Sequence, residues 1–272
     1  MHRSGTTLLS QALINHGLFM GKYREKNEEA LFFLKLNSWM LRQANATWDA
    51  PENFLHGSDK FYERMARVCE DQVRSPFKFL KYLGLNRFAN KNSIRKSKLS
   101  WGWKDPRTTF TLPVWQKIYP EAKILHIYRN PVDVAQSLRK RAIMEEMSFR
   151  PNIKTRLKEN LLIGRNQYTG SFNVMNLYNG FKLWSLYVNK ALQYEGALHI
   201  KYEDLLQSPQ PTLSKIIRSV NLEVDEITMA LTAGQFDKSR RFAFVKSDEL
   251  CTFYERIKSD PLVKKLGYSD IL

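Results

Sequence analysis

His2-Arg3-Ser4-Gly5-Thr6-Thr7-Leu8-Leu9, directly after Met1, is the stretch that decides how the rest of the chain is interpreted. Gly5 permits a sharp turn and a close approach of the backbone to a ligand. The two threonines can cap a following helix, whose first N–H groups and dipole favour an anion. Arg3 adds a fixed charge and a planar fork of donors. The stretch therefore predicts an anion-binding loop at the N-terminus of a helix over 8–16, which Gly17 ends.

This loop differs from the phosphate loop of magnesium-dependent nucleoside triphosphatases. That loop reads G-x-x-x-x-G-K-[ST], with a lysine on the outer phosphates and a hydroxyl on the metal. Here no lysine follows Gly5, and the basic residue Arg3 precedes the turn. From these residues alone, an ordinary helix cap after a polar turn is an equal alternative.

Composition narrows the class of protein. The 272 residues are 43% apolar and suit one globular domain over 1–272. The formal net charge of +16 favours anionic partners. The two cysteines, Cys69 and Cys251, are isolated and predict neither a metal site nor a disulfide framework. Because no membrane-spanning apolar run and no signal peptide are visible, we expect a cytoplasmic protein.

The hydrophobic pattern alternates between helices and strands. We expect further helices over 28–45, 60–73, 111–119, 132–141, 174–195 and 211–220, and strands over 99–104, 123–129 and 197–202. This alternation predicts an α/β fold, a parallel sheet with helices on both faces. Residues 86–100 read as a basic loop, and about 142–170 as a polar, irregular, substrate-facing insertion.

Two more polar motifs follow predicted strands. Lys104-Asp105-Pro106-Arg107 ends the first strand, and Arg129 ends the second. The carboxyl ends of strands gather at one rim of an open α/β sheet, where ligands bind. Ser137 lies eight residues after Arg129, about two helical turns into the next helix. We therefore expect Arg129 and Ser137 to hold one anion together.

Taken together, these motifs resemble the sulfotransferases that use 3′-phosphoadenosine 5′-phosphosulfate (PAPS), which have a P-loop-type fold. The opening loop resembles their 5′-phosphosulfate loop, although many members have lysine where this chain has Arg3. The segment Arg129 to Ser137 resembles their 3′-phosphate motif. Trp101-Gly-Trp-Lys-Asp-Pro-Arg107 is similar to a block of the bacterial-type, carbohydrate-directed branch, and Lys201-Tyr-Glu-Asp-Leu-Leu206 to a late block. The resemblance covers roughly residues 2–222.

The resemblance implies a role for each motif. Arg3, Ser4, Gly5, Thr6 and Thr7 would bind the 5′-phosphosulfate, and Arg129 and Ser137 the 3′-phosphate. Lys104 and Arg3 would stabilise the transferring group. No metal is needed when cationic side chains neutralise the charge. The acceptor hydroxyl or amine would belong to a carbohydrate or glycolipid rather than a phenol, and no specific nucleic-acid partner is implied.

The resemblance implies a glutamate after the first helix as the general base. Glu29, eight residues before Asn37, fits the family's glutamate best, and Glu28 is the adjacent alternative. A solvated glutamate at a helix start is the competing interpretation. His2 and Arg107 are weaker candidates for contact with the substrate.

Other polar or aromatic residues receive structural interpretations. We expect Asp105 to orient Lys104 or its loop, and Glu203 and Asp204 to fix the turn after the last strand. His126 and Trp184 are interpreted as core residues.

Two other function classes stay open at this stage. A nucleotide kinase or NTPase would show magnesium-dependent turnover of ATP, and a non-enzymatic module would bind polyanions with a steep salt dependence. In the sulfotransferases an apolar strand runs into the loop. We therefore expect that the sequence begins at an internal methionine and that the first core strand of the sheet is missing from it.

Overall fold

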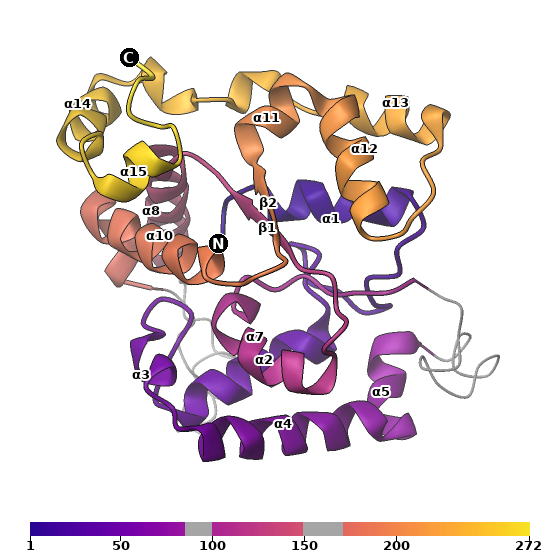
Figure 1. The fold of residues 1–272 in the computed structure, drawn as a ribbon. Helices are drawn as coiled ribbons and strands as arrows, with labels where there is room; N and C mark the ends of the chain where they lie inside the picture. Colours follow the sequence, from indigo (N-terminus) through magenta and orange to yellow (C-terminus); the bar gives the residue numbers. More distant parts are fainter. Residues whose placement is uncertain (85–99, 149–170) are drawn as a thin grey trace. The chain divides into compact units, whose positions relative to one another are not determined.

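The computed structural model describes residues 1–84, 100–148 and 171–272. They form two compact units, Met1–Asn130 with Leu186–Ala243, and Pro131–Ser185 with Phe244–Leu272. The first unit holds α1 (Thr6–Asn15), α2 (Leu31–Gln43), α3 (Glu52–Leu55), α4 (Asp59–Arg74), α5 (Pro76–Leu83), α7 (Thr108–Ile118), β1 (Leu125–Tyr128), β2 (Leu198–Lys201), α11 (Tyr202–Gln207), α12 (Pro209–Ser219), α13 (Glu226–Gly234) and η3 (Lys238–Arg240) (Figure 1).

The remaining elements belong wholly or partly to the second unit. It holds α8 (Pro131–Ser148), η2 (Asn173–Met175), α14 (Asp248–Ile257) and α15 (Pro261–Lys265). Two elements cross the boundary between the units, namely α10 (Leu177–Leu192) and η4 (Ala243–Lys246).

The sheet of the first unit has two described strands. β1 and β2 are parallel, with Leu125 opposite Leu198 and Ile127 opposite Ile200. Their apolar side chains share one core with α1, α11, α12 and α13. A parallel pair joined through helices is what an α/β protein requires, so the predicted fold class is confirmed at this level.

The predicted strand over 99–104 does not form in the described residues. Trp101 makes a single parallel bridge with Phe19, and Gly102 N–H donates to the Phe19 carbonyl. One short bridge on one side is too little pairing for a strand, and residue 99 lies outside the described part. The sequence pattern was therefore wrong about strand formation here, although the segment is extended at Trp101.

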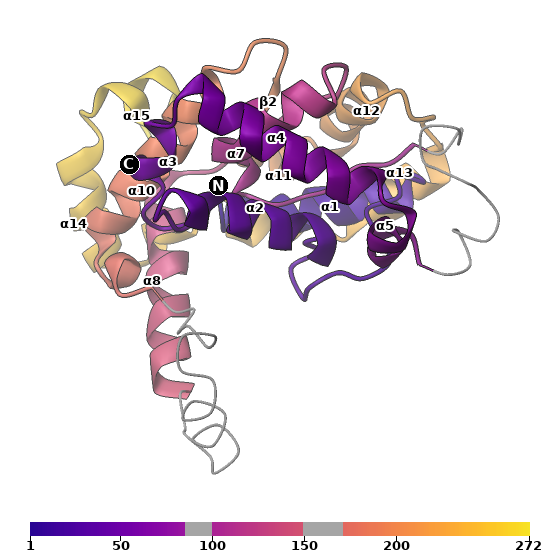
Figure 2. The same cartoon turned by 90° about the horizontal axis from the view of Figure 1, so that it is seen from below.

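Most predicted helices are present, with shifted ends. α4 begins after Ser58, whose hydroxyl accepts from Phe61 N–H as an N-cap. The short helices α3, α5 and α11 were not predicted. α8 continues to Ser148, so the interpretation of 142–148 as irregular is wrong (Figure 2). The basic loop predicted at 86–100 and the insertion from 149 onward fall on residues outside the described part, apart from Ser100.

An aromatic cluster supports the helices that precede β1. The Phe33 ring of α2 stacks on Trp103 at 4.1 Å between centroids and lies edge-on to Trp115 of α7 at 5.2 Å. Phe33, Tyr82 and Trp115 are almost fully buried. Aromatic pairs of this kind add to the free energy of burial. The cluster fixes the segment that carries Lys104 against α2 and α7.

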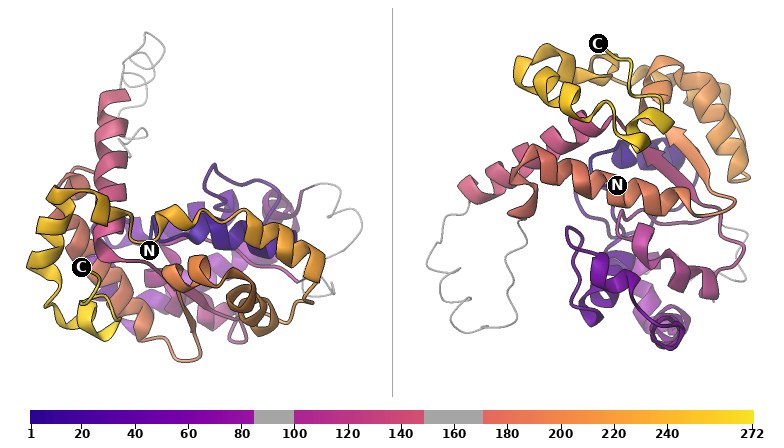
Figure 3. Two further views of the ribbon diagram at one scale, coloured as in Figure 1. Left: turned by 90° about the horizontal axis from the view of Figure 1, so that it is seen from above. Right: turned by 60° about the vertical axis from the view of Figure 1, so that its left-hand side comes forward.

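The second unit packs helices against one another. Gly180 on α10 lies so close to α8 that a Cβ there would be 3.1 Å from the backbone of Ala135. Arg139 on α8 makes a two-point ion pair with Glu249 on α14, at 2.6 and 2.8 Å. Figure 3 shows α14 and α15, in yellow, side by side. Trp184 is fully buried, as predicted for a core residue.

Candidate active site

The loop before α1 has the backbone that the sequence predicts. Gly5 is left-handed, with a φ of 89°, and serves as the N-cap without a side-chain hydrogen bond to the helix. Arg3 is exposed and also has a positive φ, 65°. Ser4 is completely buried, and its hydroxyl has no hydrogen-bond partner among the described residues. An uncapped helix N-terminus and an unsatisfied hydroxyl are features that favour an anion at this loop.

The carbonyl of Asn27 ties this loop to Lys104. Thr7 Oγ1 donates to that carbonyl at 3.2 Å. Lys104 Nζ donates to the same oxygen in a short contact. Two motifs almost a hundred residues apart are thereby brought to one backbone atom. The first turn of α1 and the Lys104 ammonium therefore lie close together.

Lys104 also forms a buried ion pair with Glu29. Nζ lies 3.3 Å from Glu29 Oε1, and the two side chains are 11% and 5% exposed. Burial, followed by the charge of Asp105, raises the pKa of Glu29 above its ordinary value of 4.5, although Lys104 and Arg107 oppose this. Burial also lowers the pKa of Lys104. Such a carboxylate is suited to accept a proton.

The neighbouring Glu28 has a different environment. It is half-buried and forms an ion pair with Arg24 at 2.9 Å. It also has a positive φ of 64°, which sets its direction apart from that of Glu29. Of the two candidate bases, Glu29 is the one that lies against Lys104.

Arg107 lies between two carboxylates. Its Nη1 donates to Asp105 Oδ1 at 3.0 Å and lies 3.7 Å from Glu29 Oε2. The Arg107 backbone N–H donates to the same Asp105 oxygen at 3.0 Å. We expect Asp105 to orient Lys104 or its loop, and its hydrogen bonds agree with the second of these roles, because they close the turn from Lys104 to Arg107.

His2 lies among aromatic rings. It is 7% exposed, with its ring 4.8 Å from that of Trp48 and 6.2 Å from that of Tyr187. The Tyr187 hydroxyl donates to the Trp48 carbonyl at 2.7 Å, and burial raises the Tyr187 pKa well above 10.0. Tyr187 was not singled out in the sequence, because an aromatic residue in a helix pattern indicates only a core position.

Arg129 directly follows β1. The ring of Tyr202 connects it to the loop before α1. Its guanidinium lies 4.7 Å from the centroid of the Tyr202 ring, and its Nη2 donates to the Arg240 carbonyl at 2.8 Å. The same Tyr202 ring lies against Gly5, where a Cβ would be 2.3 Å from Cδ2. This position of Tyr202 was not predicted from the sequence.

Ser137 lies on α8, in the other compact unit. Its sharing of an anion with Arg129 stays a prediction. Glu203 has a structural contact at another place than predicted: its Oε1 accepts from Asn130 N–H at 2.9 Å, after the end of β1, and not in a turn after β2. His126 is buried and contacts His199, Nδ1 to Nδ1, at 3.0 Å, which confirms it as a core residue.

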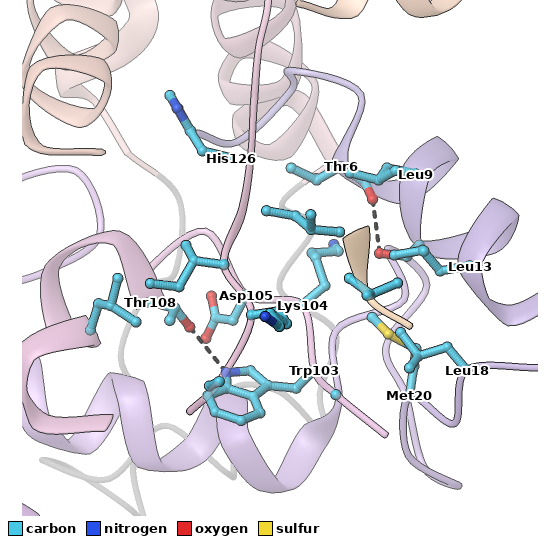
Figure 4. A pocket seen from close by; sticks show the side chains of 18 of the residues that line it. Thr6, Leu9, Leu13, Leu18, Met20, Trp103, Lys104, Asp105, Thr108 and His126 are labelled. Carbon is cyan, nitrogen blue, oxygen red and sulfur yellow. Dashed lines mark hydrogen bonds between the residues drawn. The ribbon is translucent and has the colours of Figure 1, made fainter. Parts of the chain in front are cut away.

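A cavity of about 690 Å³ lies beside these residues (Figure 4). Lys104, Asp105 and Thr6 border it, but much of its wall is apolar, from Leu9, Leu13, Leu18, Met20, Leu112, Ile118, Ile127 and Ala191. Met1 also lines it, and burial and the nearby Lys104 lower the pKa of the Met1 amino group to about 5. Within the described ranges, no group of three or more His, Cys, Asp or Glu side chains could hold a metal ion.

The fold and the site define an α/β protein in which a glycine loop at a helix N-terminus lies beside a buried carboxylate–ammonium pair. The chain belongs to the sulfotransferase family, whose family model matches residues 1–226. No curated protein and no solved structure matches it. The resemblance noted from the sequence is thereby confirmed at the level of the family, which indicates sulfuryl transfer. None of the described helices has the length and apolar character for a membrane crossing.

Proposed function

We propose that the protein transfers a sulfuryl group from PAPS to a hydroxyl or amine acceptor and releases 3′-phosphoadenosine 5′-phosphate. The observation that carries this proposal is the buried Glu29–Lys104 pair, held beside the first turn of α1 through the Asn27 carbonyl. That arrangement supplies a base and a cation next to an anion-binding loop, which are the groups that sulfuryl transfer needs.

The donor would be held by residues of both predicted motifs. Arg3, Ser4, Gly5, Thr6 and Thr7 would surround the 5′-phosphosulfate, with the N–H groups of α1 directed to its oxygens. Arg129 and Ser137 would bind the 3′-phosphate. The position of Arg129 on the ring of Tyr202, which also contacts Gly5, supports its place near the loop.

The chemical step requires one proton transfer and the replacement of one S–O bond by a bond from sulfur to the acceptor's oxygen or nitrogen. Glu29 would take the proton from the acceptor as its oxygen or nitrogen forms a bond to sulfur. The bond between sulfur and the 5′-phosphate oxygen breaks, and the Lys104 ammonium would stabilise the charge on that leaving oxygen together with Arg3. Before this step, Lys104 must give up its contacts with Glu29 and Asn27 and contact the donor instead. Glu29 is then free to act as the base.

We propose that the acceptor is a carbohydrate or glycolipid. We also propose that the protein is cytoplasmic. The net charge of +16 favours an acceptor that is itself anionic. Arg107, 17% exposed, and His2 are the candidates for contact with it. The predicted substrate-facing insertion lies mostly within 149–170, outside the described residues, and a single domain over 1–272 likewise stays a proposal.

We infer a wider, P-loop-type sheet that has a place for one more strand beside β1. Because Leu198 N–H donates to the Ile124 carbonyl, the backbone groups of Leu125 and Ile127 point away from β2. Similarly, Phe19 pairs with Ser100 and Gly102, so the backbone groups of Trp101 and Trp103 point away from Phe19.

The cavity is bordered by both of these segments. At about 690 Å³ it is large compared with the voids of a packed protein interior, which seldom exceed the size of a water molecule. These observations support a core strand at this place in the sheet.

Thermal unfolding with three nucleotides tests the proposed function. 3′-Phosphoadenosine 5′-phosphate should raise the unfolding temperature more than adenosine 5′-phosphate or ATP does, because only it has a group for Arg129. Stabilisation by ATP with magnesium alone would favour a kinase. Salt-sensitive binding of heparin with no response to the bisphosphate would favour a polyanion-binding module.

A further inference from the structure

Asn37 on α2 is a fully buried amide at the centre of the hydrogen bonds around the site. Its Nδ2 donates to Asp105 Oδ2 at 2.9 Å and to Thr108 Oγ1 at 3.1 Å. Its Oδ1 accepts from Thr111 Oγ1 at 2.8 Å and from Trp115 Nε1 at 2.7 Å. An amide has two N–H donors and two acceptor lone pairs, so every hydrogen-bonding position of Asn37 is used.

These bonds divide the two oxygens of Asp105 between different partners. Oδ2 accepts from Asn37, and Oδ1 accepts from the backbone and side chain of Arg107. The guanidinium of Arg107 consequently contacts Asp105 through one oxygen, although arginine and carboxylate prefer a two-point pair. The Nη1 of Arg107 is left within 3.7 Å of Glu29 Oε2.

We propose that Asn37 is a positioning residue that shares Arg107 between Asp105 and Glu29. By holding Asp105 Oδ2, Asn37 prevents a two-point Arg107–Asp105 pair, which would draw the guanidinium away from Glu29. Asn37 does not touch the reacting atoms; it acts through Asp105 and Arg107. This inference rests on the proposed function for its relevance to catalysis, but its physical content concerns only residues of the free protein.

The charged groups around Glu29 set the direction of the expected effect. Lys104 and Arg107 lower the pKa of Glu29, and Asp105 raises it. Three more titratable groups belong to this cluster. Tyr187 is uncharged over the relevant range because its own pKa is raised, and the Met1 amino group and Glu28 both act on Lys104 and keep their places in both variants. If Arg107 moves to Asp105, Glu29 loses one of its two cations. Its pKa then rises, since an opposite charge at this distance favours the ionised form.

The test compares Asn37→Leu with Thr111→Val. Leucine has the branching of asparagine but cannot donate to Asp105. Thr111 is equally buried and bonds to the opposite side of the same amide. Valine there removes one hydrogen bond without freeing Asp105. Both variants should lose stability, and only Asn37→Leu should alter the surroundings of Glu29.

The readout is the titration of the Glu29 carboxyl carbon by NMR, assigned from the signal that Glu29→Gln removes. Asn37→Leu should raise the midpoint by about one pH unit, and Thr111→Val should leave it in place. An unchanged or lowered midpoint in Asn37→Leu, or an equal rise in Thr111→Val, would overturn the proposal. If Asn37→Leu does not fold, Asn37→Ala, which is smaller and also cannot donate to Asp105, replaces it with the same expected rise.

The titration needs neither PAPS nor an acceptor. A chain that titrates as expected but transfers no sulfate would disprove the proposed function and leave the positioning role intact. Normal sulfate transfer by the unmodified protein, together with an unchanged Glu29 midpoint in Asn37→Leu, would disprove the positioning role and support the proposed function.

Discussion

Replacing Gly5 by alanine separates two reasons why glycine is required in the loop. At a φ of 89° an L-residue is strained by roughly 1–2 kcal/mol. In addition, the new Cβ would lie 2.3 Å from Tyr202 Cδ2 and 2.6 Å from Cε2, so the buried ring must move. Overpacking of this kind costs roughly 1–3 kcal/mol, which gives about 2–5 kcal/mol in total.

Gly17 provides the matched control for that substitution. It has nearly the same φ, 88°, and no atom within 4 Å of the position of a Cβ. Gly17→Ala should therefore lower the free energy of unfolding only by the backbone strain, roughly 1–2 kcal/mol. Urea denaturation of both variants measures the free energies of unfolding, and their difference isolates the clash with Tyr202.

Binding of the bisphosphate extends this comparison to function. The Tyr202 ring also supports the guanidinium of Arg129. Gly5→Ala should therefore weaken binding of 3′-phosphoadenosine 5′-phosphate, measured by calorimetry at a temperature where the variant is folded, and Gly17→Ala should not. Equal stability and equal affinity in the two variants would refute the close packing of Gly5 on Tyr202 as the reason for glycine.

Of four further predictions, two concern the base, one the donor site and one the sheet. Glu29→Gln should keep bisphosphate affinity and lose roughly 10²–10⁴-fold in turnover. In the unmodified protein, turnover should rise with pH through a midpoint above 4.5, since the raised pKa of Glu29 must be exceeded before it acts as a base; a pH-independent rate would argue against it. Arg129→Ala should weaken the affinity for the bisphosphate roughly 10-fold or more, and Arg218→Ala, an exposed control, should not change it. Equal affinities in the two variants would show that Arg129 is not part of the site. A five-residue Val/Ile segment joined to Met1 should stabilise the fold by roughly 2–4 kcal/mol over a Gly/Ser segment of equal length, and equal stability would contradict a strand in the cavity.

The sequence predicted best those features that depend on residues close together in the chain. The loop at Gly5, the helix after it and the strand before Arg129 follow from turn residues and apolar periodicity, which are properties of neighbouring residues. Lys104 beside Thr7 could be anticipated only because parallel strands bring their carboxyl ends to one rim. The structure adds the common partner, the Asn27 carbonyl, which no side-chain pattern encodes.

What the sequence could not predict depends on contacts between distant segments. The four hydrogen bonds of Asn37 come from α7 and the turn before it, about seventy residues along the chain. Tyr202 acquires its place beside Gly5 from tertiary packing alone. The strand over 99–104 failed for a related reason, because its apolar pattern is correct but a strand also needs partners along its edges.

The most direct test of the account is sulfate transfer itself. Purified protein is incubated with PAPS labelled in the sulfuryl group and a panel of sugars, glycolipids, polysaccharides, amines and phenols, with Lys104→Met run in parallel. We predict that label passes to a carbohydrate or glycolipid and that Lys104→Met, although folded, transfers far less. A folded protein that binds the bisphosphate yet labels no acceptor, or that labels one equally well without Lys104, would contradict the account.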